Sequence, residues 1–363
     1  MEREGQRKHG LLFGITARTL MCIAGGLLVL SYLSTYINPS KAWYMTVFGL
    51  LFLPLLIVNA GLLAWALYRK SKAAMIPLLC LLPALLFCGR FVQIGSRSGA
   101  KAGDIKIISY NVGRFALYRK GSFTNRRECA DSVFAFLRRQ DADIICLQEF
   151  QTISGENVRD FIRKRLKGYD IQYYFNVGRR EAYGNVTLSR FPATSKGKIN
   201  FEKSSNLVLY SDYKIDGRPL RVYNCHLESY NISLSRLARM ADYKAAVNDT
   251  EYRMKRSIRK RPEQVEQILE NFESGPSEAC ITGDFNDNPM SYTYNRLIRG
   301  RKDSFCEAGS GVGATYSVFR PLLRIDYILY PEMFRATGHE VIHKNYSDHY
   351  PVLATIDMHY DNE

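Results

Sequence analysis

Cysteine is scarce in this sequence, and the few cysteines form no pattern of metal ligands. The chain of 363 residues contains 8 cysteines, and no two of them form a Cys-x-x-Cys pair. This spacing excludes a zinc ribbon, and the low content excludes a small domain held together by disulfides. The sequence is 46% hydrophobic and 23% charged, so it also lacks the composition of a disordered chain. No internal repeat is apparent.

Acidic residues are nearly missing from the first 94 positions, where Glu2 and Glu4 are the only ones. Three long apolar stretches follow one another there, and Arg90 is the only charge within them. A helix needs about 20 mainly apolar residues to cross a bilayer core, and each stretch has that length. Three such stretches with almost no polar face favour membrane spans over buried core helices. We therefore expect transmembrane helices at about 19–38, 43–68 and 75–94.

Basic residues are distributed unevenly around these stretches. They occur before the first stretch and between the second and third, whereas only Lys41 separates the first two. The basic residues concerned are Arg3, Arg7 and Lys8, and then Arg69, Lys70 and Lys72. Positively charged loops stay in the cytoplasm, so three crossings carry the following domain to the outside. The prediction is an integral protein of the plasma (inner) membrane with its soluble domain on the extracytoplasmic side.

The remaining sequence reads as one soluble domain. Residues 1–94 form the expected anchor, 95–104 a polar Gly- and Ser-containing linker, and 105–363 the soluble domain. Enrichment in β-branched and aromatic residues predicts strands at 105–111, 143–147, 172–177, 186–189, 207–215, 220–227, 279–284, 324–329 and 352–358. Helices are expected at 128–140, 158–167, 233–247, 262–272 and 292–298. Strands with helices between them indicate an α/β domain with both sheet faces covered.

Polar side chains occur where several predicted strands end. They are Asn111, Glu149, His226, Asp284 with Asn286, Asp326, and Asp348 with His349. Residues two apart on a strand face the same way, so Asn224, His226 and Glu228 should face a cleft, while Tyr223, Cys225 and Leu227 face a core. The cysteines at 146, 225 and 280 lie in apolar strands, where a buried thiol is the common role. No disulfide framework is expected.

Asp326 is an unusual residue for a strand. It is flanked by Ile325 and Tyr327, and an ionised carboxylate in such surroundings requires a partner. A histidine is suited to this role because the carboxylate fixes its tautomer, and His349 is our candidate. A solvent-facing Asp at a strand edge is the alternative reading.

This set of residues can support hydrolysis of phosphate esters. A hard cation such as Mg²⁺ prefers oxygen ligands, which Asn111, Glu149 and Asp348 offer. Asp284 and His349 both remain candidates for the base that takes a proton from water. His226 and Asn286 can donate hydrogen bonds to the charge that grows on the phosphoryl oxygens.

The order of the motifs resembles the endonuclease/exonuclease/phosphatase superfamily. The matching segments are Ser-Tyr-Asn-Val, Leu-Gln-Glu, Gly-Asn-Val-Thr-Leu-Ser-Arg-Phe-Pro, Cys-His-Leu, Gly-Asp-Phe-Asn-Asp-Asn-Pro, Arg-Ile-Asp-Tyr-Ile and Ser-Asp-His-Tyr-Pro-Val. They extend from about residue 105 to 356. Membership implies a four-layer α/β/β/α sandwich of two mixed sheets and Mg²⁺- or Mn²⁺-dependent cleavage of phosphoesters, here on a membrane-anchored, bacterial-type member.

The resemblance also implies individual roles. It assigns the metal to Asn111 and Glu149 with Asp348 close to the ion, and the scissile phosphate to His226. Asp284 would orient or deprotonate water, Asn286 would brace it, and Asp326 would pair with His349. Some nuclease members have an acidic residue two positions after the first Asn, where this sequence has Gly113. That departure disfavours a DNA-repair nuclease.

The resemblance does not name the substrate, because the family contains nucleases, phosphatases and phospholipases. A membrane anchor favours phosphoesters near a bilayer, such as lipid head groups, over the alternative of extracytoplasmic nucleic acid. The basic run over 253–261 fits a solvated helix face, anionic lipid or nucleic-acid phosphates. A catalytically silent module that binds a phosphorylated ligand is the alternative of another class. Since no catalytic position is lost, an enzyme is favoured.

Overall fold

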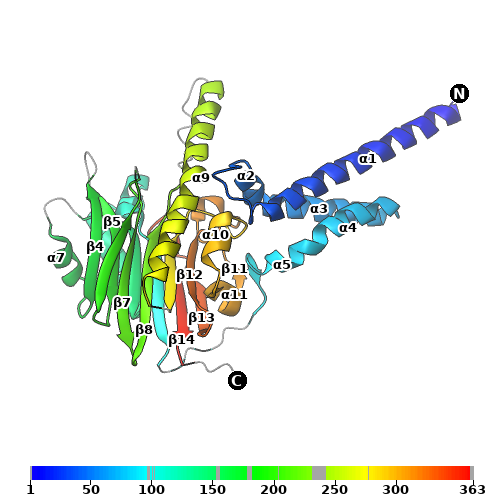
Figure 1. The fold of residues 1–363 in the computed structure, drawn as a ribbon. Coiled ribbons are helices and arrows are strands. Elements are labelled where there is room, and N and C mark those ends of the chain that lie inside the picture. Colours follow the sequence, from blue (N-terminus) through cyan, green and yellow to red (C-terminus); the bar gives the residue numbers. More distant parts are fainter. Residues whose placement is uncertain are drawn as a thin grey trace.

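The computed structural model describes residues 2–95, 99, 101, 103–152, 156–177, 182–202, 204–230, 243–276 and 278–359. Two mixed β-sheets with helices on their outer faces make up the larger part, and an arm of apolar helices extends from one side (Figure 1). Part of the expected linker 95–104 and of the expected helix 233–247 lies outside the described residues.

Each of the two large sheets has six strands and one parallel pair at its centre. The order in the first sheet is β13 (Arg335–Val341), β14 (Val352–Asp357), β2 (Ile105–Asn111), β3 (Ile144–Phe150), β5 (Ala182–Ser189) and β4 (Asp170–Val177). The order in the second sheet is β10 (Arg301–Asp303), β12 (Asp326–Pro331), β9 (Ala279–Asp284), β8 (Arg218–His226), β7 (Leu207–Ile215) and β6 (Ser195–Asn200). β2 and β3 are parallel, as are β8 and β9.

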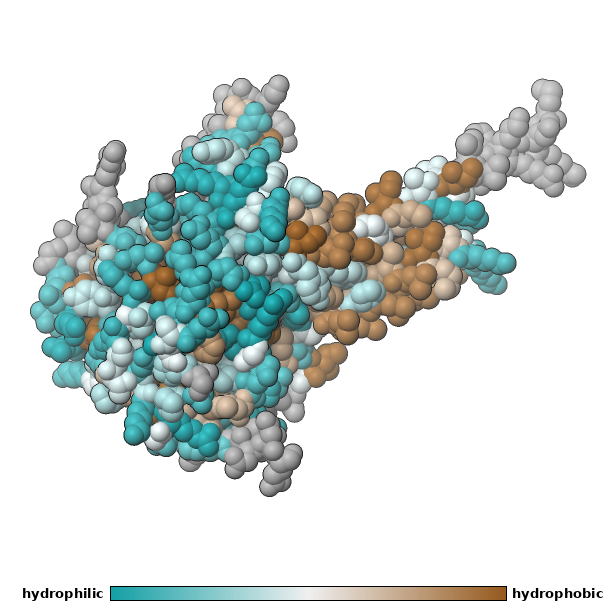
Figure 2. Space-filling model, viewed as in Figure 1, coloured by the Kyte–Doolittle hydropathy of each residue, from teal (hydrophilic) through white to brown (hydrophobic). Residues whose placement is uncertain are grey.

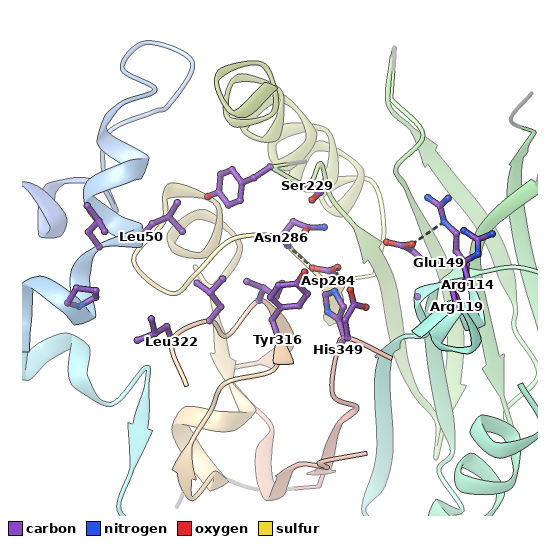
Figure 3. A pocket seen from close by; sticks show the side chains of 18 residues that line it. Leu50, Arg114, Arg119, Glu149, Ser229, Asp284, Asn286, Tyr316, Leu322 and His349 are labelled. Carbon is purple, nitrogen blue, oxygen red and sulfur yellow. Dashed lines mark hydrogen bonds and ion pairs between the residues drawn. The ribbon is translucent and has the colours of Figure 1, made fainter. Parts of the chain in front are cut away.

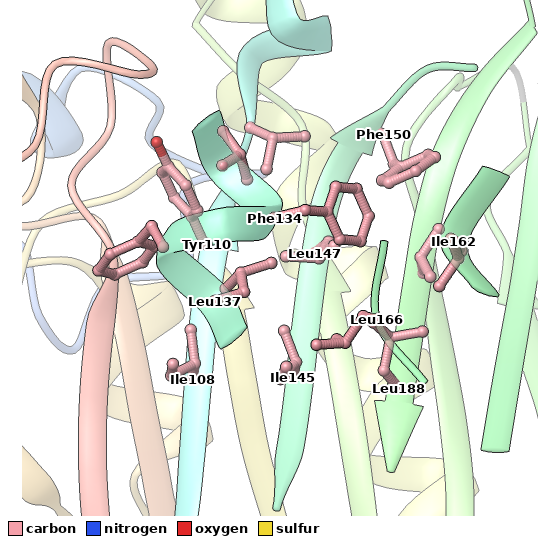
Figure 4. Packing of buried hydrophobic residues seen from close by; sticks show 14 of the residues in the cluster. Ile108, Tyr110, Phe134, Leu137, Ile145, Leu147, Phe150, Ile162, Leu166 and Leu188 are labelled. Atoms are coloured by element: carbon pink, nitrogen blue, oxygen red, sulfur yellow. The ribbon is translucent and has the colours of Figure 1, made fainter. Parts of the chain in front are cut away.

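The buried side chains define four layers. Between the sheets, Ile107 and Cys146 of the first sheet pack with Val222 and Cys280 of the second. On the outer face of the first sheet lie α6 (Arg126–Gln140) and α7 (Val158–Arg163), whose apolar residues pack on β2, β3 and β5 (Figure 4). On the outer face of the second sheet lie α9 (Tyr243–Glu273) and α10 (Tyr292–Leu297). The expected α/β fold with two mixed sheets is confirmed.

All 8 cysteines are free thiols, and those at 146, 225 and 280 are buried.

Several expected boundaries were wrong. β6, β10 and β13 were not predicted, since β6 in particular alternates lysine with small polar residues instead of apolar ones. The helix expected to begin at Pro262 is the second half of the 31-residue α9, which contains this proline. A proline inside a helix removes one backbone hydrogen bond. The packing of Val265 and Ile268 against the second sheet compensates for that loss.

The arm contains the three apolar stretches, with different boundaries. Its helices are α1 (Glu2–Leu33), α2 (Met45–Leu50), α3 (Phe52–Tyr68), η1 (Lys72–Ala74), α4 (Met75–Leu81), η2 (Leu82–Ala84) and α5 (Leu85–Cys88). Among the described residues, only Gly14–Leu33 is both long and apolar enough to cross a membrane, and Phe52–Tyr68 and Lys72–Cys88 are shorter apolar helices. The second stretch breaks at Leu51, and the third ends at Cys88 because β1 (Val92–Gln93) pairs with β11 (Gly311–Val312).

The arm is fastened to the loop that follows strand β9. The Asn288 side-chain amide donates to the Gly49 carbonyl at 2.9 Å, and the Ser34 hydroxyl donates to the Met290 carbonyl at 2.7 Å. The Arg90 guanidinium donates to the Pro289 carbonyl at 3.0 Å. The Met290 side chain is fully buried in an apolar cluster supplied by the arm. The base of the arm is therefore packed directly against the part of the molecule that contains the two large sheets.

A buried histidine makes stability depend on pH. His339 of β13 lies within 2.8 Å of the Ser304 hydroxyl, and burial lowers the pKa of its imidazole to about 3. The unfolded chain protonates this group below a pH of about 6.5, whereas the folded chain does not. The free energy of unfolding should therefore fall as pH decreases below that value, by at most about 1.4 kcal/mol per pH unit from this group.

We expect His339→Gln to reduce this pH slope in denaturant unfolding measured between pH 7 and pH 5. His359→Gln is the matched control, since the His359 side chain is half exposed. Equal slopes for the wild type and His339→Gln would contradict the argument.

Candidate active site

The ends of the central strands from both sheets meet at one cavity of ≈ 600 Å³. Five of the eight residues singled out from the sequence line it: Glu149, Asp284, Asn286, Asp348 and His349 (Figure 3). The other three, Asn111, His226 and Asp326, lie behind these and contact them. The sequence-based expectation that these side chains gather at strand ends therefore agrees with the geometry.

A histidine lies between two buried carboxylates at the centre of the site. The first residue of β12, Asp326, is directly opposite the last residue of β9, Asp284, in an antiparallel register. His349 Nδ1 is 3.0 Å from Asp326 Oδ2, the contact expected from the sequence, and its Nε2 is 3.7 Å from Asp284 Oδ2. All three side chains are almost fully buried. The imidazole thus joins two like charges that would otherwise repel each other.

Burial and neighbouring charges shift the pKa values of Asp284 and His349. Burial raises the pKa of Asp284, and the Asp326 carboxylate acts in the same direction. Burial alone would lower the pKa of His349, but the carboxylates of Asp326 and Asp284 outweigh it and raise that pKa. The stable arrangement near neutral pH is therefore an imidazolium held between carboxylates.

A hydrogen bond across the two sheets connects this group to the metal candidates. Asn111, the last residue of β2, donates through Nδ2 to Asp284 Oδ2 at 2.9 Å. The same nitrogen is 3.4 Å from Glu149 Oε1, and His226 Nε2 is 3.7 Å from that oxygen. Glu149 is thus bordered by an amide and an imidazole within one half-buried corner.

Left-handed backbone at two positions sets the direction of side chains at this corner. Glu149 has φ 50°, and the pairing of β3 with β5 shifts register around it, which marks a bulge. Arg114, at φ 57°, donates through Nε to Glu149 Oε2 at 3.2 Å and lies 3.8 Å above the Tyr183 ring. A side chain at the preceding Gly113 would be strained, because its φ is 52° and a Cβ there would lie 2.9 Å from Ser347 Oγ.

Asn286 is held in place from two sides. Its backbone N–H donates to Asp284 Oδ1 at 2.8 Å, and its side-chain amide donates to the Leu227 carbonyl at 3.0 Å. Its own carbonyl accepts a hydrogen bond from Arg261 at 2.7 Å. The buried Arg261 guanidinium also stacks on the Tyr230 ring at 3.9 Å. The loop after β9 is therefore fixed by a residue of α9.

The basic run over 253–261 has more than one role. Arg261 is buried in the position just described, Arg253 pairs with Asp249, and Lys260 lies 3.5 Å from Glu228. Arg256 and Arg259 are exposed. The run is therefore partly a structural element beneath the site and partly a solvated face.

Two predicted orientations differ from the structure. Asn224 does not reach a cleft, because its side chain is buried between the sheets and accepts from Gln148 Nε2 at 2.8 Å. Glu228 points away from the centre and accepts a hydrogen bond from Ser204 at 2.5 Å. Strand β8 ends at His226, so the alternation of side chains does not continue to Glu228.

Sequence reasoning missed several polar residues that line the cavity, among them Arg114 and Tyr316. The ring of Tyr316 lies 5.0 Å from that of His349, and burial, together with the carboxylates of Asp348 and Asp284, raises its pKa to about 12. It therefore keeps its hydroxyl proton at neutral pH. No strand or helix pattern signals either residue, since both lie on irregular segments.

The donors around Glu149 suit a divalent cation such as Mg²⁺ or Mn²⁺. Glu149 and Asp348 line the same cavity, and the absent side chain of Gly113 leaves room for Asp348 Oδ1, which a Cβ would approach to 3.2 Å. Carboxylate and amide oxygens are the ligands that hard cations prefer. Asp284, Asp326 and His349 also have ligand atoms within 4.8 Å of one another. However, His349 Nδ1 already contacts both oxygens of Asp326. We therefore interpret Asp284, Asp326 and His349 as a group that shares a proton and not as a metal site.

Comparison with known proteins agrees with this geometry. The profile of the Endonuclease/Exonuclease/phosphatase family matches residues 108–349, two thirds of the chain. The chain belongs to this family. Residues 12–91 match a separate domain of unknown function (DUF8431). A search of the curated proteins found no significant match.

Solved structures share the endonuclease/exonuclease/phosphatase fold at low identity. A family member from Bacteroides vulgatus is 18% identical, covers 70% of this chain and 98% of its own, and has a TM-score of 0.52. The human Nocturnin catalytic domain with bound sulfate is 16% identical, with coverages of 71% and 96% and a TM-score of 0.52. A humanized D. rerio TDP2 is 17% identical, with coverages of 70% and 100% and a TM-score of 0.50. At these identities the similarity concerns the fold.

Gly283 should be indispensable for the position of Asp284. It has φ 129°, and a Cβ there would lie 2.0 Å from the Cys225 carbonyl oxygen. We expect Gly283→Ala to lower the free energy of unfolding by about 3 kcal/mol or more, because both the clash and the backbone conformation oppose a side chain. Thermal unfolding measures this loss. The control is Gly61→Ala in α3, where a Cβ meets nothing within 4 Å; equal melting temperatures for the two variants would refute the argument.

Proposed function

We propose that this protein is a membrane-tethered, divalent-metal-dependent hydrolase of phosphoester bonds that acts on lipid head groups. The observation that supports the chemistry is the convergence of Glu149, Asp284 and His349 on one cavity, with His226 and Asn111 in contact behind them. In the reaction, a water oxygen bonds to phosphorus, the ester P–O bond breaks, and the alcohol leaves with a proton.

The buried group of Asp284, His349 and Asp326 is suited to handling the water proton. Asp284 accepts hydrogen bonds from Asn111 and from the Asn286 backbone, so its carboxylate is fixed in direction. We assign Asp284 the task of orienting the water and accepting its proton. His349, held by Asp326, stabilises the charge on Asp284 from the other side.

Three donors can meet the negative charge on the phosphoryl oxygens. His226 lies beside Glu149, and Asn286 and Arg114 line the cavity. Glu149, Asn111 and Asp348 would hold the divalent ion. When bound, that ion would withdraw charge from the phosphoryl oxygens and lower the barrier to attack. Arg114 pairs with Glu149 at 3.2 Å in this structure. When Glu149 binds the divalent ion instead, the Arg114 guanidinium would be free to donate to the phosphate.

The helical arm supports attachment to a membrane. Its surface is mostly apolar over residues 14–33 of α1 and over α3 and α4, in contrast to the hydrophilic part that contains the two large sheets, here called the catalytic half (Figure 2). The 17 residues of α3 span about 26 Å at 1.5 Å per residue, close to the roughly 30 Å of a bilayer core. Arg18 and Arg69 lie together in a pocket whose lining comes from α1, α3 and the turn after α3. This arrangement favours three crossings, with the catalytic domain outside the cytoplasm.

The first prediction for this site concerns catalysis. The full chain in detergent should hydrolyse bis-para-nitrophenyl phosphate with Mg²⁺ or Mn²⁺ and stop when a chelator is added. Glu149→Gln, His226→Ala and Asp284→Ala should each lower kcat by about 100-fold or more, because each removes a group at the phosphorus or the ion. Glu228→Gln is the matched control, since that carboxylate binds Ser204 outside the site. Unchanged rates in all three variants, with folding intact, would refute the assignment.

The second prediction concerns the substrate. Reconstituted into vesicles, the full chain should release head groups from sphingomyelin or a phosphoinositide faster than it cleaves plasmid DNA, RNA or a soluble inositol phosphate. The reason is that the arm holds the cavity at the membrane surface. Product release at equal phosphoester concentration is the measurement. Preference for DNA or RNA would favour the nuclease alternative, and tight ligand binding without turnover would favour a binding module.

A further inference from the structure

The active-site cavity has two unlike ends. Its catalytic end contains the carboxylates, His349 and two arginines, whereas its opposite end is aliphatic (Figure 3). The aliphatic residues are Leu50, Leu51, Pro54, Leu322, Leu323 and Ile325. Leu50, Leu51 and Pro54 belong to the corner between α2 and α3, and the others to the segment before β12. The arm therefore supplies part of the active-site wall in addition to any role as an anchor.

Some side chains of this aliphatic wall are exposed to solvent. Leu51 is 44% exposed and Leu322 is 38% exposed, although both border a cavity of ≈ 600 Å³. Covering apolar side chains of this kind is favourable, so the space is suited to an apolar part of a ligand. Aliphatic side chains carry no charge to pair with a nucleic-acid backbone, and the wall therefore does not favour a nucleic acid.

The wall is continuous with the surface that would face lipid. Pro54 lines the cavity, and Ile57 and Val58 follow it three and four residues later on α3, so they lie on the same face of the helix. Ile57 is 67% exposed and Val58 is 50% exposed. An aliphatic path therefore runs from the aliphatic end of the cavity onto the exposed face of α3.

We infer that the aliphatic wall holds the hydrocarbon tail of the substrate, so that Leu50 and Leu322 determine specificity for phosphoesters that carry such a tail. This inference rests on the proposed phosphoester hydrolysis and names its substrate class. The phosphate lies at the catalytic end, and the tail leaves along α3. A lipid can then be hydrolysed while its tail stays in contact with apolar surface throughout.

The test measures how rate depends on tail length. The full chain in lipid nanodiscs is assayed on para-nitrophenyl phosphodiesters whose second ester group is methyl, hexyl or dodecyl. The kcat/KM of the wild type should rise by about tenfold or more from methyl to dodecyl, because each added methylene gains apolar contact. Leu322→Asn and Leu50→Asn should each flatten this rise mainly through KM.

Met333→Asn is the matched control, because Met333 is 48% exposed on the catalytic half and does not line the cavity. It should retain the full dependence on tail length. Since Leu322 is a partly exposed residue of the catalytic half, its variant tests the inference even if Leu50→Asn fails to fold. A wild-type rate that does not change with tail length, or a slope that is equal in Leu322→Asn and Met333→Asn, would overturn the inference. Absence of metal-dependent cleavage of the methyl ester would instead contradict the proposed function.

Discussion

Two buried carboxylates facing each other across a pair of strands are the constraint on which this site depends. Asp284 and Asp326 are register partners in β9 and β12, and like charges placed opposite each other destabilise a sheet. Burial of such groups without a partner would cost several kcal/mol. The imidazole of His349, which precedes β14 of the other sheet, lies between them. The charge that stabilises the pair therefore also aligns the ends of the two sheets.

The same alignment connects catalysis to the arm. The loop that begins at Asp284 continues within six residues to Met290, whose side chain is buried among residues of the arm. Arg261 of α9 holds the middle of this loop through the Asn286 carbonyl. The base of the arm, the loop after β9 and α9 thus form one packed unit. A catalytic domain on a flexible tether would lack this contact, and its cavity would lack the part of the aliphatic wall that Leu50, Leu51 and Pro54 supply.

The sequence was sufficient to predict the central strands and the side chains at their ends. β2, β7 and β9 begin and end where their β-branched and apolar runs do, and the polar residues that terminate such runs gather at one edge. Asp326 could be paired with a histidine because a carboxylate in an apolar strand has few other partners. These inferences succeed because they depend on local pattern and on the cost of burying charge.

Other features depend on contacts distant in the sequence. The bulge at Glu149 and the left-handed backbone of Arg114 have no periodic signal, so the direction of these side chains was not predictable. Arg261 belongs to a basic run that resembles a solvated face, yet it is buried by its stacking on Tyr230. The contribution of Leu50 to the cavity requires the arm to fold back on the catalytic half. The polar edge strand β6 carries too few apolar residues to be recognised.

The central claim is that the residues from Asn111 to His349 bind one divalent ion and one phosphate together. Anomalous diffraction at the manganese edge, from crystals of the full chain grown with Mn²⁺ and phosphate, tests it most directly. The account predicts a manganese peak bonded to the Glu149 carboxylate, with phosphate density between that peak and His226. A manganese peak between Asp326 and His349, or no peak in the cavity, would contradict it.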